Sequence, residues 1–240
     1  MKFQHGVAIS FLVAGLTGSL AAQESSPQLT HVLKQMDTAS AAFQRATADF
    51  RWDYYEKIVH DTTTDTGSIY FERQGNSMAM GAVVLAPGGN ETQKYSKILE
   101  YKNGSLQIFD TGADQITMVA AGANQAQYEG FLTLGFGGSG TDLNRTWKIQ
   151  DMGAETLSDD GKPVATEKLD LTPRDTNANN MFTHVTVWVD VTRGVSLKQV
   201  FYTASGNYRT ATYSHIVVNG NVHKDHFAIK KDKNTTVVNH

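Results

Sequence analysis

The stretch KILEYKNGSLQIFDTGADQITMV, residues 97–119, changes direction twice and decides the fold. Asn103 and Gly104 supply the two positive φ angles that a two-residue type I′ turn requires, and they separate two runs with the composition of strands. A second turn over residues 110–114 leads into a third such run. The stretch predicts an antiparallel meander, and we expect the faces of that sheet to carry the function.

Similar strand and turn signals recur through most of the 240 residues. The aromatic segment at residues 49–60 is not among the expected strands. Residues 61–67 are expected to form a polar turn. We expect further strands over residues 68–73, 77–85, 93–102, 147–157, 162–172, 182–190, 195–203 and 207–218, with a last strand ending near Ile229.

One amphipathic helix precedes the strands. Ser26-Pro27 has the residue types of an N-cap followed by proline at the first helical position, and apolar residues then repeat at helical spacing from Leu29 to Phe43. The pattern predicts a helix over about residues 27–46. A short helix and a flexible loop are expected over residues 128–140. About eleven strands with these helices are typical of a mainly β fold, an open (incomplete) antiparallel β-barrel with a helical lid and an N-terminal helix.

The first residues predict an export signal. Lys2, an apolar run at 7–16 and the small residues at 19–22 have the pattern of a secretory signal peptide over residues 1–22; a retained anchor helix is the alternative. We expect residues 23–240 to form a single domain. The chain contains no cysteine, which excludes a disulfide framework, a thiol nucleophile and lipid attachment at a cysteine. We therefore expect a soluble periplasmic protein that is not lipidated.

Charge and motif content exclude several classes of function. The formal net charge is −3 and no basic cluster occurs, which argues against nucleic acid as a partner. Residues 135–140 fit G-x-G-x-x-G but lack the βαβ context of a dinucleotide site. Residues 61–72 lack the glycine of a calcium loop, and His223 and His226 have no third ligand, so we expect no metal and no cofactor. The sequence contains no G-x-S-x-G nucleophile motif and no obvious catalytic triad, so an enzyme is not expected.

Strict alternation assigns the side chains of one expected strand to two faces. Ile69, Phe71 and Arg73 share one face. A guanidinium on an apolar face is costly unless its donors are hydrogen-bonded, so Arg73 either pairs with an acid or caps backbone carbonyls of a covering element. The alternative is an arginine that reaches solvent at the end of the strand.

Large and flexible apolar side chains are frequent in this sequence. Methionines such as Met78, Met80 and Met118, together with Phe131 and Phe136, adapt to irregular apolar partners, which suits a cavity for acyl chains. The same residues also fill ordinary cores, so their presence leaves both interpretations open.

Several short segments resemble a known family. Gly67–Arg73 (GSIYFER), Lys102–Asp110 (KNGSLQIFD), Asp114–Val119 (DQITMV) and Leu169–Pro173 (LDLTP) are similar to motifs of the periplasmic outer-membrane lipoprotein carriers, LolA, and more loosely of the receptor LolB. The resemblance extends over residues 29–230. It departs from the family where Gln74 replaces a proline and where a polar tail, residues 230–240, replaces the usual C-terminal extension.

The resemblance implies an unclosed antiparallel barrel whose hydrophobic cavity, covered by helices, takes the acyl chains of lipoproteins or other lipids. It also implies an inner-membrane ABC transporter and an outer-membrane receptor as partners. The lid arginine of the family carries over to Arg73, which we expect to bond to backbone carbonyls near residues 128–140. A lipid-binding sensor that transports nothing, or a hydrolase acting on lipids, are the alternatives. We expect the cavity and its lid to be formed by Ile69, Phe71, Arg73, Met78, Met80, Leu106, Ile108, Met118, Phe131 and Phe136.

Overall fold

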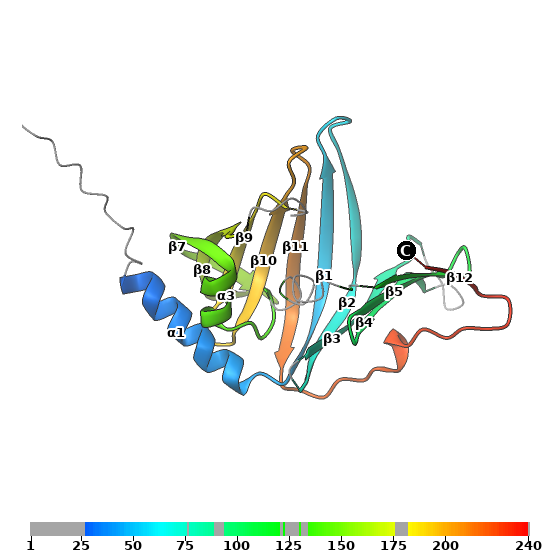
Figure 1. The fold of residues 1–240 in the computed structure, drawn as a ribbon, viewed down its shortest axis with the longest axis horizontal. Helices are drawn as coiled ribbons and strands as arrows, with labels where there is room; N and C mark the ends of the chain where they lie inside the picture. The colour runs from blue at the N-terminus through cyan, green and yellow to red at the C-terminus, as the bar shows by residue number, and fades with distance from the viewer. Residues whose placement is uncertain are drawn as a thin grey trace, which may run out of the picture.

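One curved sheet contains every strand that the structure describes (Figure 1). The structure is a computed structural model and describes residues 27–75, 77–88, 94–120, 122, 130, 134–175 and 182–239; the expected signal peptide lies outside them. Within these residues the sheet has twelve strands in the order β12-β6-β5-β4-β3-β2-β1-β11-β10-β9-β8-β7, so it is open between β12 and β7. This confirms the mainly β, unclosed architecture with helices.

The elements follow the chain in a simple order. Their bounds are α1 (Pro27–Ala42), β1 (Arg45–Glu56), β2 (Asp61–Gln74), β3 (Ser77–Leu85), β4 (Tyr95–Lys102), β5 (Ser105–Asp110), β6 (Gln115–Ala120), α3 (Gly140–Thr146), β7 (Trp147–Asp159), β8 (Lys162–Pro173), β9 (His184–Asp190), β10 (Val195–Tyr202), β11 (Tyr208–Val218), the 3₁₀ turn η2 (Asp225–Phe227) and β12 (Thr236–Asn239). No helix among the described residues has both the length and the apolar character needed to cross a bilayer.

The hairpin turns have the backbone that the sequence predicts. Asn103 and Gly104 have φ angles of 52° and 73°, and Asp160 and Gly161 repeat these values at the turn between β7 and β8. Two successive positive φ angles match the right-handed twist of the flanking strands. These turns fix the register of β4 against β5 and of β7 against β8.

The prediction was wrong for the first hairpin. Residues 61–67 are not a turn, because β2 begins at Asp61 and pairs along its length with β1, which contains the aromatic segment. The reversal lies instead at residues 57–60. Threonines are β-branched and favour strands even in a polar run. The run is polar because this end of the hairpin projects past its neighbours into solvent (Figure 1).

Two further boundaries differ from the prediction. Helix α1 ends at Ala42, and Phe43 starts the connection to β1. No strand ends near Ile229, since Asp225–Phe227 forms a 3₁₀ turn. The last strand lies inside the tail that was expected to be merely polar: Thr236–Asn239 pairs with β6 and runs parallel to it, so the sheet is not purely antiparallel.

Each face of the sheet packs against a different part of the chain. The inner face is the one that α1 and α3 cover, and Val32 and Met36 of α1 are buried there against Leu169 and Val187. The outer face is opposite, where the C-terminal segment places Phe227 against Tyr70. Figure 1 shows α1 and α3 beside the half of the sheet formed by β7–β10. The other half of the inner face is therefore left for a different covering element.

Candidate functional site

An apolar cavity of about 220 Å³ lies on the inner face, between the two halves of the sheet. Register places its residues together: Phe71 pairs with Met80, Met80 with Tyr101, and Tyr101 with Leu106 across four adjacent strands. Directly opposed residues of neighbouring strands share a face, so these side chains form one continuous wall. The described residues that line the cavity are Trp52, Ile69, Phe71, Met80, Tyr101, Leu106, Phe136, Phe182, Gln199, Phe201, Arg209, Ala211 and Tyr213.

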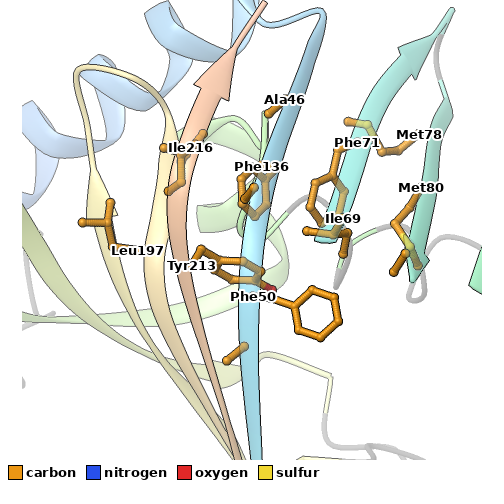
Figure 2. Close-up of a cluster of buried hydrophobic side chains, with 14 of the residues drawn as sticks. Ala46, Phe50, Ile69, Phe71, Met78, Met80, Phe136, Leu197, Tyr213 and Ile216 are labelled. Carbon is orange, nitrogen blue, oxygen red and sulfur yellow. The ribbon is translucent and has the colours of Figure 1, made fainter. Parts of the chain in front are cut away.

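Residues 134–139, here called the roof segment, cover one end of this cavity. Phe136 is 1% exposed, stacks on Phe71 with ring centroids 4.3 Å apart, and meets Tyr213 edge-on at 5.0 Å. Figure 2 shows Phe136 among these side chains and Ile69. A backbone bridge between Phe136 and Val195 joins the roof segment to the start of β10. The roof therefore fills part of the hollow with its own aromatic ring.

Arg73 ties the roof segment to the end of α1. Its Nη2 donates to the carbonyl of Gly137 at 2.8 Å, and its Nε donates to the carbonyl of Phe43 at 3.2 Å. The hydroxyl of Ser40 donates to the same Gly137 carbonyl at 2.7 Å. Arg73 remains partly exposed at the end of β2, so it both meets carbonyls and reaches solvent. The contact with Gly137 falls within residues 128–140, as the sequence predicts.

Gly137 allows the roof segment to pack directly against Phe43. Its φ is +75°, a conformation that side chains rarely adopt, and a Cβ there would lie 2.4 Å from the ring of Phe43. The same residue donates its backbone N–H to the carbonyl of Gly194 at 3.2 Å. Position 137 thus requires glycine for both backbone conformation and space.

The cavity has a small polar part beside its apolar walls. Gln199 is 4% exposed, and the hydroxyl of Tyr213 donates to its side-chain oxygen at 3.5 Å. Burial raises the pKa of Tyr213 to about 12, so this phenol stays protonated at neutral pH. Arg209 lies at the exposed rim. A ligand in the cavity therefore meets apolar surface first and hydrogen-bonding groups at a few defined points.

A larger cavity of about 480 Å³ lies between α1, α3 and Arg73. Polar groups contribute much of its lining, among them Ser40, Ser139, Asp142 and Arg145. Apolar ligands gain little there, because burial of hydrocarbon is favourable only when the surface that meets it is also apolar. We therefore take the smaller, apolar cavity as the candidate site.

The ten residues expected at the site do not all line the cavity. Ile69, Phe71, Met80, Leu106 and Phe136 line the cavity. Met78 is buried in the adjoining core, and Ile108 shares the face of Leu106 without lining the cavity. Phe131 lies outside the described residues.

Met118 does not belong to the site. It pairs with Gln107, whose neighbours in the strand are Leu106 and Ile108, so alternation puts Met118 on the outer face. The turn over residues 110–114 sets this register, which assigns Thr117 and Val119 to the inner face instead.

Sequence reasoning missed the residues that the other half of the sheet contributes to the cavity. Alternation on β10 and β11 would have grouped Gln199 with Phe201 and Arg209 with Ala211 and Tyr213. Nothing in the local sequence indicates that these strands lie next to β1, since that pairing joins segments far apart in the chain.

No family model matches this chain, and no curated protein matches it. An uncharacterized conserved protein from Thermus thermophilus aligns over 89% of this chain and 99% of its own, with 10% identity and a TM-score of 0.51. MucB aligns over 86% of this chain and 64% of its own, with 13% identity and a TM-score of 0.52. These similarities concern the fold. The open, mainly β sheet with helices on its inner face agrees with the fold class that the sequence predicts.

Proposed function

We propose that this protein is a periplasmic carrier that binds acyl chains of lipoproteins or other lipids in the inner-face cavity and carries them toward the outer membrane. The observation that supports this most directly is an apolar cavity covered at one end by a roof segment that is attached through hydrogen bonds and one aromatic ring. On this proposal an inner-membrane ABC transporter loads the protein and an outer-membrane receptor unloads it. The exported location rests on the predicted signal peptide.

With the roof segment in place, the cavity is too small for a whole long acyl chain, so binding of the chain requires the roof segment to move. Its volume of about 220 Å³ is below the roughly 300–1,000 Å³ of ordinary ligand pockets. Displacing Phe136 from between Phe71 and Tyr213 extends the cavity toward α1. The proposed mechanism therefore exchanges the ring of Phe136 for the hydrocarbon of the ligand.

The free-energy cost of opening the roof segment and the gain from burying an acyl chain are of similar size. Four hydrogen bonds hold the roof segment to Arg73, Ser40, Gly194 and Ser196, and each contributes roughly 0.5–1.5 kcal/mol net. Exposing Phe136 costs about 1.5–3 kcal/mol more. Burying an acyl chain is worth about 0.8 kcal/mol per methylene, on the order of 10 kcal/mol per chain. The binding of an acyl chain can thus open the roof segment. Because the gain exceeds the cost by only a small amount, the ligand can also be released.

Native mass spectrometry of protein purified from its own periplasm tests the binding step. We expect intact acyl ligands to co-purify, and protein with an empty cavity under lipid-rich conditions would contradict the proposal. Transfer of a fluorescent lipid from donor to acceptor vesicles then tests transport. Retention without transfer would identify a sensor or binding module, and recovery of cleaved lipid would identify a hydrolase.

A further inference from the structure

The rim of the cavity carries a cation on its apolar inner face. Arg209 comes from β11 and lies opposite Phe201 of β10 and Tyr54 of β1, and all three share the face that lines the cavity. Arg209 is exposed to solvent. A guanidinium in this position faces whatever part of a ligand protrudes from the apolar hollow.

Arg209 is not neutralised by a carboxylate. Arg51, Arg145 and Arg193 have aspartate oxygens within 2.7–2.8 Å, but no ion pair involves Arg209 among the residues that the structure describes. Its guanidinium lies over the ring of Tyr54, 5.8 Å from the ring centre. On the same face, Asp65 belongs to β2, one strand beyond Trp52, so β1 separates it from Arg209. The positive charge at the rim therefore remains available.

A second donor lies beside this charge. The side-chain amide of Asn207 donates to the hydroxyl oxygen of Tyr54 at 3.0 Å, so the proton of that hydroxyl is free to be donated elsewhere. Asn207 is held in turn, because its side-chain oxygen accepts the backbone N–H of Lys57 at 3.0 Å. The oxygen of the Tyr54 hydroxyl, on the strand next to that of Arg209, is thus held by Asn207, and its proton is left for an acceptor.

We infer that the cavity takes an anionic amphiphile, with the acyl chain in the hollow and a carboxylate or phosphate at the rim between Arg209 and Tyr54. This inference rests on the proposed function, because it names the class of lipid that the same cavity accepts. Arginine presents a planar fork of donors that matches both anions, and charge-assisted hydrogen bonds are stronger than neutral ones. A neutral headgroup gains neither advantage.

Affinities for matched lipids test the inference. The probes are palmitate, lysophosphatidic acid and monopalmitoylglycerol, each below its micelle-forming concentration and each with one acyl chain. We expect wild-type protein to bind at least one anionic probe about tenfold more tightly than the neutral one, as charge-assisted bonds at a partly exposed site allow. Preference for palmitate identifies a carboxylate ligand, and preference for lysophosphatidic acid identifies a phosphate.

Variants separate the headgroup contact from the acyl contact. In Arg209→Gln we expect the anionic probes to lose about tenfold more affinity than monopalmitoylglycerol, so that the anionic preference disappears, and Arg209→Lys should keep part of the preference. Arg51→Gln, a change on the outer face, is the matched control and should behave as wild type. Equal affinity of wild type for all three probes, or an equal loss for all three in Arg209→Gln, overturns the inference but leaves the carrier proposal standing. Failure of every probe to bind overturns both.

Discussion

Tyr70 and Phe71 are adjacent along β2, and each anchors a different layer of the molecule. Phe71 points to the inner face and stacks on Phe136 of the roof segment, whereas Tyr70 points to the outer face and meets Phe227 edge-on at 4.9 Å. Alternation in one strand therefore places the contact to the roof segment and the contact to the C-terminal segment on opposite faces of the sheet. The two phenylalanines that these residues contact are both buried, which makes them a matched pair for mutagenesis.

Replacing Phe136 with alanine should lower stability and enlarge the cavity. Loss of a buried phenylalanine costs about 3–5 kcal/mol, measured as the free energy of unfolding in urea. We also expect tighter binding of acyl probes, because the ring no longer has to be displaced. Phe227→Ala should cost a similar amount and leave binding unchanged, since Phe227 lies on the outer face. If both variants changed lipid affinity alike, Phe136 would have no special part in opening the cavity.

Replacing Arg73 with leucine should loosen the roof segment. The change removes the donors to Gly137 and Phe43, and hydrogen bonds to a charged group at a partly exposed site suggest a loss of about 1–2 kcal/mol. Hydrogen exchange should become faster at the backbone amides of residues 134–143, with faster release of bound lipid. Arg73→Lys keeps the positive charge but loses the planar set of guanidinium donors, so its exchange and release rates should lie between those of wild type and Arg73→Leu. Unchanged exchange and release in Arg73→Leu would remove Arg73 from the mechanism.

Replacing Gly137 with alanine should destabilise the packed roof segment. We expect the loss of stability to exceed the cost of placing alanine at a positive φ angle. A Cβ at position 137 meets the ring of Phe43 at 2.4 Å, whereas Gly153, with φ of +86°, has open space around it. Gly153→Ala therefore measures the backbone strain by itself, about 1–2 kcal/mol. We expect a larger loss in thermal or urea unfolding for Gly137→Ala. Equal losses would mean that Phe43 moves aside without cost.

The contact between the C-terminal segment and the sheet should weaken in acid. Glu72 of β2 forms an ion pair with Lys224, and this hydrogen bond lowers the pKa of Glu72 from its ordinary value of 4.5. Because the folded pKa is the lower one, the pair stabilises the fold above about pH 4.5 and loses its contribution as the pH falls through the folded pKa.

The variant Lys224→Met tests this dependence. At pH 7 we expect it to be less stable than wild type by about 0.5–1 kcal/mol, as is usual for partly exposed pairs. Urea unfolding at pH 7 and at pH 3 should show the difference between the two proteins shrinking in acid. A difference that is independent of pH would assign the effect to packing of the Lys224 side chain over the Tyr70 ring instead.

Local patterns predicted the parts of the fold that local chemistry determines. The Asn103-Gly104 turn and the shared face of Ile69, Phe71 and Arg73 follow from turn residues and from the two-residue period of a strand. The Met118 error came from a register that depends on the length of a turn rather than on composition.

Features that depend on distant pairing could not be predicted. The pairing of β1 with β11 brings Arg209 beside Tyr54, and no sequence period reports which strands become neighbours. The polar start of β2 was missed because solvent surrounds it, so it lacks the apolar alternation that normally marks a strand.

The parallel pairing of β12 with β6 has a practical consequence for work on this protein. Residues 236–239 pair with β6 and form a short edge strand of the sheet, and the opposite edge strand, β7, is interrupted by an irregularity between Asp151 and Ala154. A long unpaired edge strand is a template for joining molecules edge to edge. Chains shortened before Thr236 replace the four-residue edge strand β12 with the six-residue strand β6 and should therefore self-associate more readily, so purification tags are better placed between the expected signal peptide and α1 than after β12.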